Sequence, residues 1–389
     1  MHHLKMLQAA ALVAALSLAG CQNHSSMNSV TEPDVAPGVA MGGASSFHFD
    51  GPHTVYTLSN ATAGNSILRY SQGESGALSF RGEFPTGGKG SGGALASQGS
   101  LIRHGEMFFA VNAGSNEISA LRETGGGMRL IGKVASGGSM PVSVTVHGDL
   151  LYVLNEGGDG NITGYRGAAS GHLTMINGSS RPLSGSGVGP AQVEFNPSGT
   201  VLVVTEKNTN KIDTYRFGFD GKVQGPDVQN STGQTPYGFE FTPSGQLIVS
   251  DAFGGTAGLS SLTSYRVGFS GGLDLITGPV QNGQAAACWV VVTDDGRFTY
   301  TTNAGTNNIS GYQIRRGGAL VLLHDGGVTA TSDASPNDAS LSNGSRILFV
   351  RNAGGNSITS YAVNPVSGAL TAMGKATGLP ASAVGLASM

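Results

Sequence analysis

Two pairs of carboxylates stand at matching positions of neighbouring segments, and they are the residues best suited to acid–base chemistry. Glu194 and Glu240 each lie four residues after a proline. Glu206 and Asp251 each end a hydrophobic run, at a position where comparable runs end in Asn. A carboxylate removed from bulk water must be paired, hydrated or protonated, so each pair could hold or transfer a proton.

Polar and aromatic residues accompany these carboxylates. A hydrolytic reaction would use Glu206 or Asp251 as the general base that activates water, and Lys207 or Gln192 would stabilise the oxyanion. The residues suited to holding a substrate are Gln192, Glu194, Tyr237, Glu240 and Trp289. The alternative is structural, because the glutamates could form ion pairs with nearby Lys or Arg residues and Trp289 could pack between sheets.

Other sequence patterns give no support for metal or cofactor chemistry. The histidines are scattered without the spacing of metal ligands. The segments Gly268 to Gly272 and Gly88 to Gly93 match a hydrolase motif and a dinucleotide motif, but neither is followed by the helix that its motif requires. The segment Asn155 to Asn161 is interpreted as an Asx-rich turn, with a calcium loop as the alternative. We therefore expect no metal site and no cofactor.

These residues belong to a unit that recurs seven times: a hydrophobic run, a Gly/Asn turn and an Ile-x-x-Tyr pattern. The residue that ends each copy recurs after 44 to 51 residues, at Tyr70, Leu121, Tyr165, Tyr215, Tyr265, Tyr312 and Tyr361. A period of about 40 to 50 residues marks solenoids or propellers, and each period contains four candidate strands without helical spacing. The sequence predicts an all-β fold, a seven-bladed β-propeller of four-stranded blades.

The order of the candidate strands also predicts how the ring closes. The innermost strands are expected to begin near Gly93, Pro141, Pro190, Pro236, Ala287, Pro336 and Pro380. The first candidate strand, from Val55 to Leu58, has no inner partner before it in the sequence. We therefore expect the C-terminal segment from Pro380 to Leu386 to close the first blade, which leaves no free sheet edge at the seam.

The N-terminus has the features of a secretion signal. Residues 1–20 combine a basic start, an apolar stretch and small residues before Cys21. The sequence Leu18-Ala19-Gly20-Cys21 resembles the lipobox of bacterial lipoproteins, which implies cleavage before Cys21, attachment of acyl chains such as palmitate, and an outer-membrane destination. Residues 21–50 are predicted to be a flexible tether, and residues 51–389 the propeller.

The region from about residue 51 to 389 resembles the seven-bladed lactonase-type propellers, the family of bacterial 6-phosphogluconolactonase and fungal carboxymuconate cycloisomerase. The resemblance depends on Phe195-Asn-Pro-Ser-Gly199, Phe241-Thr-Pro-Ser-Gly245 and Thr293-Asp-Asp-Gly-Arg-Phe-Thr-Tyr300. Family members carry His, and often Arg, where the inner strands of the middle blades begin. Here those stretches read Gly189-Pro-Ala-Gln192 and Thr235-Pro-Tyr-Gly238.

Two functions follow from these observations. The resemblance implies a lactonase or cycloisomerase that acts on a small sugar-acid or dicarboxylic lactone. The alternative is a non-catalytic propeller that binds a protein or glycan partner at the bacterial envelope. The formal charge is 21 − 24 = −3, without a basic stripe, so a nucleic-acid partner is not expected. We expect a monomer that meets the membrane only through its lipid anchor.

Overall fold

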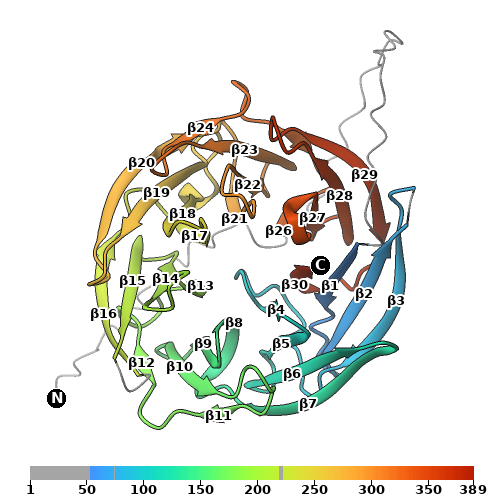
Figure 1. The fold of residues 1–389 in the computed structure, drawn as a ribbon, viewed down its shortest axis with the longest axis vertical. Coiled ribbons are helices and arrows are strands. Elements are labelled where there is room, and N and C mark those ends of the chain that lie inside the picture. The colour runs from blue at the N-terminus through green and yellow to red at the C-terminus, as the bar shows by residue number, and fades with distance from the viewer. Residues whose placement is uncertain (1–52, 74, 219–221) are drawn as a thin grey trace, which may run out of the picture.

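The computed structural model describes residues 53–389, except residue 74 and residues 219–221. The predicted signal peptide (1–20), the tether (21–50) and the lipidation site Cys21 lie outside the described residues. The described residues form a ring of seven antiparallel sheets around a central channel, as Figure 1 shows. The predicted all-β, seven-bladed β-propeller is confirmed. No helix in the described part of the chain is long and apolar enough to cross a membrane.

Each blade places one strand at the channel, and the others follow outwards. From the first blade to the seventh, the innermost strands are β30 (Val384–Ser388), β4 (Leu101–His104), β8 (Ser139–His147), β13 (Pro190–Phe195), β17 (Pro236–Phe241), β21 (Ala287–Val292) and β26 (Pro336–Leu341). The second strands are β1 (Thr54–Leu58), β5 (Met107–Asn112), β9 (Leu150–Gly157), β14 (Val201–Glu206), β18 (Gln246–Asp251), β22 (Phe298–Asn303) and β27 (Ile347–Asn352).

The two outer positions of each blade complete the sheets. The third strands are β2 (Ser66–Gln72), β6 (Glu117–Thr124), β10 (Asn161–Arg166), β15 (Lys211–Phe217), β19 (Ser261–Val267), β23 (Asn308–Ile314) and β28 (Ser357–Val363). The outermost strands are β3 (Leu78–Pro85), β7 (Gly127–Ala135), β16 (Val223–Asn230), β20 (Leu273–Gln281) and β29 (Leu370–Thr377), together with the short pairs β11 (Thr174–Met175) and β12 (Arg181–Pro182) in blade three, and β24 (Leu320–Leu322) and β25 (Ala330–Thr331) in blade six. Two single turns of 3-10 helix, η1 (Phe253–Gly255) and η2 (Asn343–Ser345), lie in loops.

The repeated Ile-x-x-Tyr pattern holds neighbouring blades together. Tyr165 on β10 donates a hydrogen bond from its hydroxyl to the carbonyl of Ala135 in the preceding blade, at 2.6 Å. Tyr215 and Tyr361 make the same kind of contact, with Pro182 and Thr331 respectively. Each ring is buried between two sheets while its hydroxyl reaches an outer-strand carbonyl, as expected of a tyrosine at an apolar interface. This repeated contact explains why the tyrosine recurs in the sequence.

The C-terminal strand closes the ring, as predicted. β30 pairs antiparallel with β1, with Tyr56 opposite Ala387 and Val55 opposite Ser388. The backbones of Thr54 and Met389 extend this pairing by hydrogen bonds of 3.0 and 3.4 Å. Every sheet is therefore complete within residues 54–388.

We name the two ends of the channel after its innermost strands. These strands begin at the amino end and finish at the carboxyl end. Because the second strands run antiparallel to them, second strands finish at the amino end. The carboxyl end carries the turns between first and second strands and those between third and fourth strands.

Blade two departs from the repeat. Its innermost strand was expected near Gly93 but begins at Leu101. The segment Leu95 to Gly99 instead crosses the channel at the amino end: Gln98 N donates to the carbonyl of Ala191 in blade four, and Val144 N in blade three donates to the carbonyl of Gly99. The prediction failed because these backbone groups pair with other blades instead of their own sheet.

Candidate functional site

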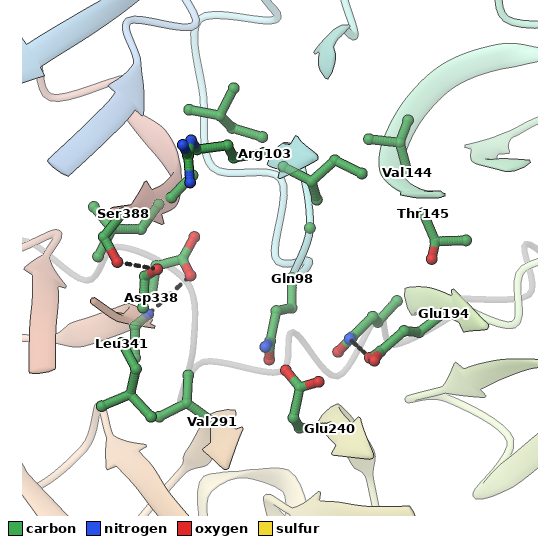
Figure 2. A pocket seen from close by; sticks show the side chains of 18 of the residues that line it. Gln98, Arg103, Val144, Thr145, Glu194, Glu240, Val291, Asp338, Leu341 and Ser388 are labelled. Atoms are coloured by element: carbon green, nitrogen blue, oxygen red, sulfur yellow. Dashed lines mark hydrogen bonds between the residues drawn. The ribbon is translucent and has the colours of Figure 1, made fainter. Parts of the chain in front are cut away.

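The central channel contains a cavity of about 420 Å³ to which the innermost strands of all seven blades contribute. Figure 2 shows its polar side chains directed towards one another from different blades. Gln98 and Gly99 border the cavity on the side of the crossing segment. A second depression, at the carboxyl end, shares Glu194, Glu240 and Asp294 with this cavity. The cavity is therefore approached from the carboxyl end.

Glu194 on β13 and Glu240 on β17 form a carboxyl pair on the cavity wall. The two carboxyls lie close enough for the charge of one to act on the other. Burial, and secondarily the charge of Glu240, raise the pKa of Glu194 well above its ordinary value. Burial raises the pKa of Glu240 to about 7, while its interaction with Glu194 acts in the opposite direction. The pair is therefore suited to hold one proton at neutral pH.

Gln192 fixes this pair in place. Its amide nitrogen donates to Glu194 Oε2 at 2.8 Å and to the carbonyl of Phe239 at 2.8 Å. Its amide oxygen accepts from Phe239 N at 2.8 Å. Since Phe239 precedes Glu240 on the neighbouring inner strand, one side chain sets the position of both carboxyls.

Asp338 on β26 supplies a third carboxyl from across the cavity (Figure 2). Burial raises its pKa to about 8, although the backbone N–H of Ala339, at 2.9 Å, and the charge of Arg351 oppose this shift. Sequence reasoning missed Asp338. An alignment of the innermost strands could have found it, because Asp338 occupies the place of Gln192, two residues after the proline.

Gln98 separates the cavity from the amino end of the channel. Its amide group makes two hydrogen bonds to Val290 of blade six, of 2.7 Å to the carbonyl and 3.1 Å from the N–H. A Cβ atom on Gly238 would lie only 2.3 Å from Gln98 Oε1, so this position requires glycine. The crossing segment is therefore held firmly in place.

Glu206 does not face the cavity. Its side chain is fully buried and accepts hydrogen bonds from Ser184 N at 3.0 Å, Ser184 Oγ at 2.5 Å and Thr209 Oγ1 at 2.6 Å. Burial and the neighbouring Glu206 carboxyl raise the pKa of Asp213 to about 8. Glu206 thus ties the loop before β13 to its own blade.

Asp251 occupies the same position one blade further on. Its Oδ2 accepts hydrogen bonds from Ser261 Oγ at 3.0 Å and Thr263 Oγ1 at 2.6 Å, and burial raises its pKa to about 7. In blade six, Asn303 uses the same place to donate to Ser310 Oγ at 2.8 Å. The two predicted general bases therefore lie inside blades four and five, where other blades place an Asn.

Lys207, Tyr237 and Trp289 gather at the amino end, on the other side of the crossing segment. Lys207 Nζ donates to the carbonyls of Ala96 at 2.8 Å and Pro190 at 3.0 Å, and lies 5.0 Å from the centre of the Tyr237 ring. Burial lowers the pKa of Lys207 to about 8. The Tyr237 and Trp289 rings pack at 5.2 Å. The eight predicted residues are therefore divided among the cavity, the blade interiors and the amino end.

Glu156 is a further charged residue that sequence reasoning did not select. It is half-buried near Lys207, whose charge counteracts the rise that burial causes in the Glu156 pKa. The signal for it is positional: the residue that follows the Asn or Asp near the end of the second strand is Ala in the other five blades, namely Ala61, Ala113, Ala252, Ala304 and Ala353. In blades three and four it is Glu156 and Lys207.

The cavity can support proton transfer without a metal ion. Within the described part of the chain, no three His, Cys, Asp or Glu side chains are grouped so that they could hold a metal. The cavity instead offers a carboxyl pair that shares a proton, a third carboxyl with a raised pKa, and the amides of Gln98 and Gln192. Such a set can accept a proton from water and donate one to a leaving oxygen.

Comparisons with known proteins agree with the resemblance stated from the sequence. Residues 270–384 match the family described as "Lactonase, 7-bladed beta-propeller". No curated protein matches the chain. Among solved structures, a periplasmic gluconolactonase from Pseudomonas aeruginosa is 18% identical, with a TM-score of 0.68 over 86% of this chain and 99% of that one. A putative 6-phosphogluconolactonase from Bacteroides fragilis is 19% identical, with a TM-score of 0.66 over 87% and 98%.

Proposed function

Because residues 270–384 match the lactonase family and the whole ring has its fold, we propose that the protein hydrolyses a small sugar-acid lactone in the central cavity. The observation that carries this proposal is that Glu194 and Glu240 stand together on the wall of an open cavity. A periplasmic gluconolactonase and a putative 6-phosphogluconolactonase are among the proteins with this fold. Fold alone does not determine chemistry, so the site carries the argument.

The two carboxyls would divide the work according to their acidity. We assign Glu240 as the ionised member, which would take a proton from the attacking water, whose oxygen bonds to the lactone carbonyl carbon. Glu194, as the protonated member, would donate its proton to the ring oxygen as the carbon–oxygen bond breaks, giving the hydroxy acid. A proton then passes from Glu240 to the neighbouring Glu194, which restores the starting state.

The surrounding groups would position the lactone. Gln98 lines the cavity beside Glu240, and Asp338 lies across the cavity from the carboxyl pair (Figure 2). A protonated Asp338 could donate a hydrogen bond to the carbonyl oxygen, where negative charge develops in the transition state. The catalytic roles that the sequence predicts for Glu206, Asp251 and Lys207 remain predictions. In the present proposal, Glu194 and Glu240 take the acid and base roles instead.

The test measures proton release from a panel of sugar-acid and dicarboxylic lactones. Glu240→Gln is expected to lower kcat by about 100-fold or more, the usual effect of losing a general base. Glu206→Gln, a buried carboxylate outside the cavity, serves as the matched control and should retain most of the activity. Loss of activity in Glu206→Gln but not in Glu240→Gln would indicate that the reaction takes place at Glu206. Absence of turnover by the wild-type protein would favour the alternative, a propeller that binds an envelope protein or glycan.

We further propose that the protein is a lipoprotein of the bacterial envelope, anchored through Cys21. The support is the Leu18-Ala-Gly-Cys21 sequence after an apolar stretch of signal-peptide length. Cys21→Ser should prevent incorporation of labelled palmitate and leave the protein unanchored, because serine lacks the sulfur that forms the thioether. Equal labelling of wild type and variant would show that the anchor assignment is wrong.

A further inference from the structure

A groove on the carboxyl face borders the mouth of the cavity. The depression at the mouth shares Glu194 and Glu240 with the cavity, and it shares Asn196, Pro197 and Pro243 with a third depression of about 540 Å³. The third depression lies between the turns that follow β13 in blade four and β17 in blade five. These two blades are neighbours in the ring (Figure 1). The three depressions therefore form one path from the carboxyl pair to the outer rim.

The outer end of this groove carries Phe269, whose side chain is 96% exposed. It stands at the tip of the β19–β20 hairpin, which is closed by hydrogen bonds between Gly268 and Gly272 and between Gly271 and Gly268. An aromatic ring that contacts so little of its own protein gains little from folding, and it is accessible to a ligand in the adjoining depression. The remaining lining is polar except for two prolines, two glycines and one valine.

The chemistry of the groove fits a sugar chain. Its walls present amide and hydroxyl groups, represented by Asn196, Ser244 and Gln246, and a single cation, Arg266. An acyl chain would remove the charged Arg266 guanidinium from water without giving it a partner. A phosphate would meet only one arginine in the groove and the carboxyls Glu194, Glu240 and Asp294 at the mouth. A sugar ring satisfies both requirements, since its hydroxyls bond to polar groups while its C–H face can lie on Phe269.

The length of the groove also sets the size of this ligand. Glu240 lies on the innermost strand of blade five, and Phe269 joins the third and fourth strands. At about 4.8 Å between neighbouring strands, the separation is roughly 12 Å, which gives room for about two or three sugar rings.

We propose that the groove binds the sugar units of an oligosaccharide whose terminal unit is a lactone, and that this lactone reaches the carboxyl pair in the cavity. The inference rests on the proposed lactone hydrolysis and specifies its substrate as an oligosaccharide aldonolactone. Contacts made far from the reacting bond would then contribute to selecting the longer substrate.

The experiment compares kcat and KM for gluconolactone with those for aldonolactones of di- and trisaccharides, across several linkages. The wild-type protein should favour at least one longer substrate by about 10-fold in kcat/KM. Phe269→Ala should remove most of that preference by raising KM for the longer substrate, and Phe269→Tyr should restore it. Gluconolactone turnover should not change in either variant. Val366→Ala is the matched control, because Val366 is 82% exposed at another hairpin tip outside the groove.

The outcomes separate this inference from the proposed function. Sugar binding by the groove would be overturned if gluconolactone is turned over without any preference for longer substrates. Equal effects of Phe269→Ala and Val366→Ala would overturn it as well. Neither result would contradict the proposed lactone hydrolysis. If no lactone is turned over, calorimetric titration with the corresponding oligosaccharide aldonates still tests the groove. Binding that Phe269→Ala weakens by about 10-fold would support the sugar site, and lack of binding would reject it.

Discussion

At the amino end of the blades, Glu206 and Asp251 are enclosed and accept hydrogen bonds from hydroxyl groups. Those of Glu206 come from the loop residues Ser184 and Thr209, and those of Asp251 from Ser261 and Thr263 on β19. Towards the carboxyl end, Glu194 and Glu240 stand together and border a cavity. All four are acidic residues that interrupt an otherwise apolar or Asn-containing repeat. The two pairs differ in their surroundings. A carboxylate whose oxygens accept hydrogen bonds from its own chain stabilises the fold, whereas a carboxylate that faces a cavity can contact a substrate.

The crossing segment explains why the two ends differ. Gln98 bonds to Val290 across the channel, and Lys207 holds the carbonyls of Ala96 and Pro190. The amino end is thereby filled by backbone and by Tyr237 and Trp289. At the carboxyl end, no segment among the described residues crosses the channel, and the cavity remains open there.

The largest expected effect comes from deleting β30, the strand that both closes the ring and lines the cavity. Deletion of residues 379–389 removes β30, which closes the first blade and contributes Ser388 to the cavity. We expect the thermal midpoint to fall by more than about 10 °C, with aggregation, because a sheet edge is exposed. Deletion of Met389 alone is the control. An unchanged midpoint for the longer deletion would show that the ring closes in another way.

A smaller effect separates the two kinds of carboxylate. Glu206→Ala leaves Ser184 N–H and two hydroxyls without their acceptor in a buried site and should lower the free energy of unfolding by about 3 kcal/mol. Glu240→Ala, on the cavity wall, should cost less than about 1 kcal/mol, since water can replace the carboxyl. Chemical denaturation measures both. If both variants lost the same free energy of unfolding, Glu206 and Glu240 would not differ in structural role as proposed.

A third expected effect is a dependence of stability on pH. Burial raises the pKa values of Asp213, Asp251 and Asp338 to about 8, 7 and 8. An acid with a raised pKa in the folded protein binds more protons when folded, so its contribution is full below the ordinary pKa and is lost as pH rises through the folded value. The thermal midpoint should therefore decrease between about pH 5 and pH 8.

Asp251→Asn tests that dependence, because Asn stands at this place in other blades and does not titrate. The variant should show a flatter pH profile than the wild type. Asp295→Asn, at an exposed aspartate whose pKa is lowered by hydrogen bonds with Thr293 and Arg297, should not flatten it. A wild-type midpoint that rises between pH 5 and pH 8 would contradict the assignment of these buried acids.

The fold could be predicted because each blade repeats the same signals. The tyrosine of the third strand recurs in six of the seven periods, and an Asn lies near the end of the second strand in most of them. Blade two was misplaced because no local pattern shows that Gln98 pairs with Val290 and Ala191, residues far away in the sequence. These contacts between blades can form only when the blades are assembled into the ring.

The candidate site could be predicted only in part. Sequence reasoning selected Glu194, Glu240 and Gln192, and the structure places them together on the cavity wall. It could not separate them from Glu206 and Asp251, because residue type does not show which way a side chain points. The innermost strands contain irregularities between Pro190 and Gln192 and after Pro236, and each such irregularity can change the face on which later residues lie.

The seam where β1 meets β30 has a consequence for how the molecule would be oriented. The carbonyl of His53 accepts a hydrogen bond from Gln72 N at the same end of the ring as Met389, so the described part of the chain begins at the carboxyl face. If residues 21–50 form the predicted flexible tether, its reach would be about 25 to 30 Å. If Cys21 is fixed in a membrane, the mouth of the cavity and the groove would look towards the lipid surface. Solutes would then have to pass sideways through a narrow aqueous gap, and the clearance of that gap would act as a size filter before any side chain of the protein is reached.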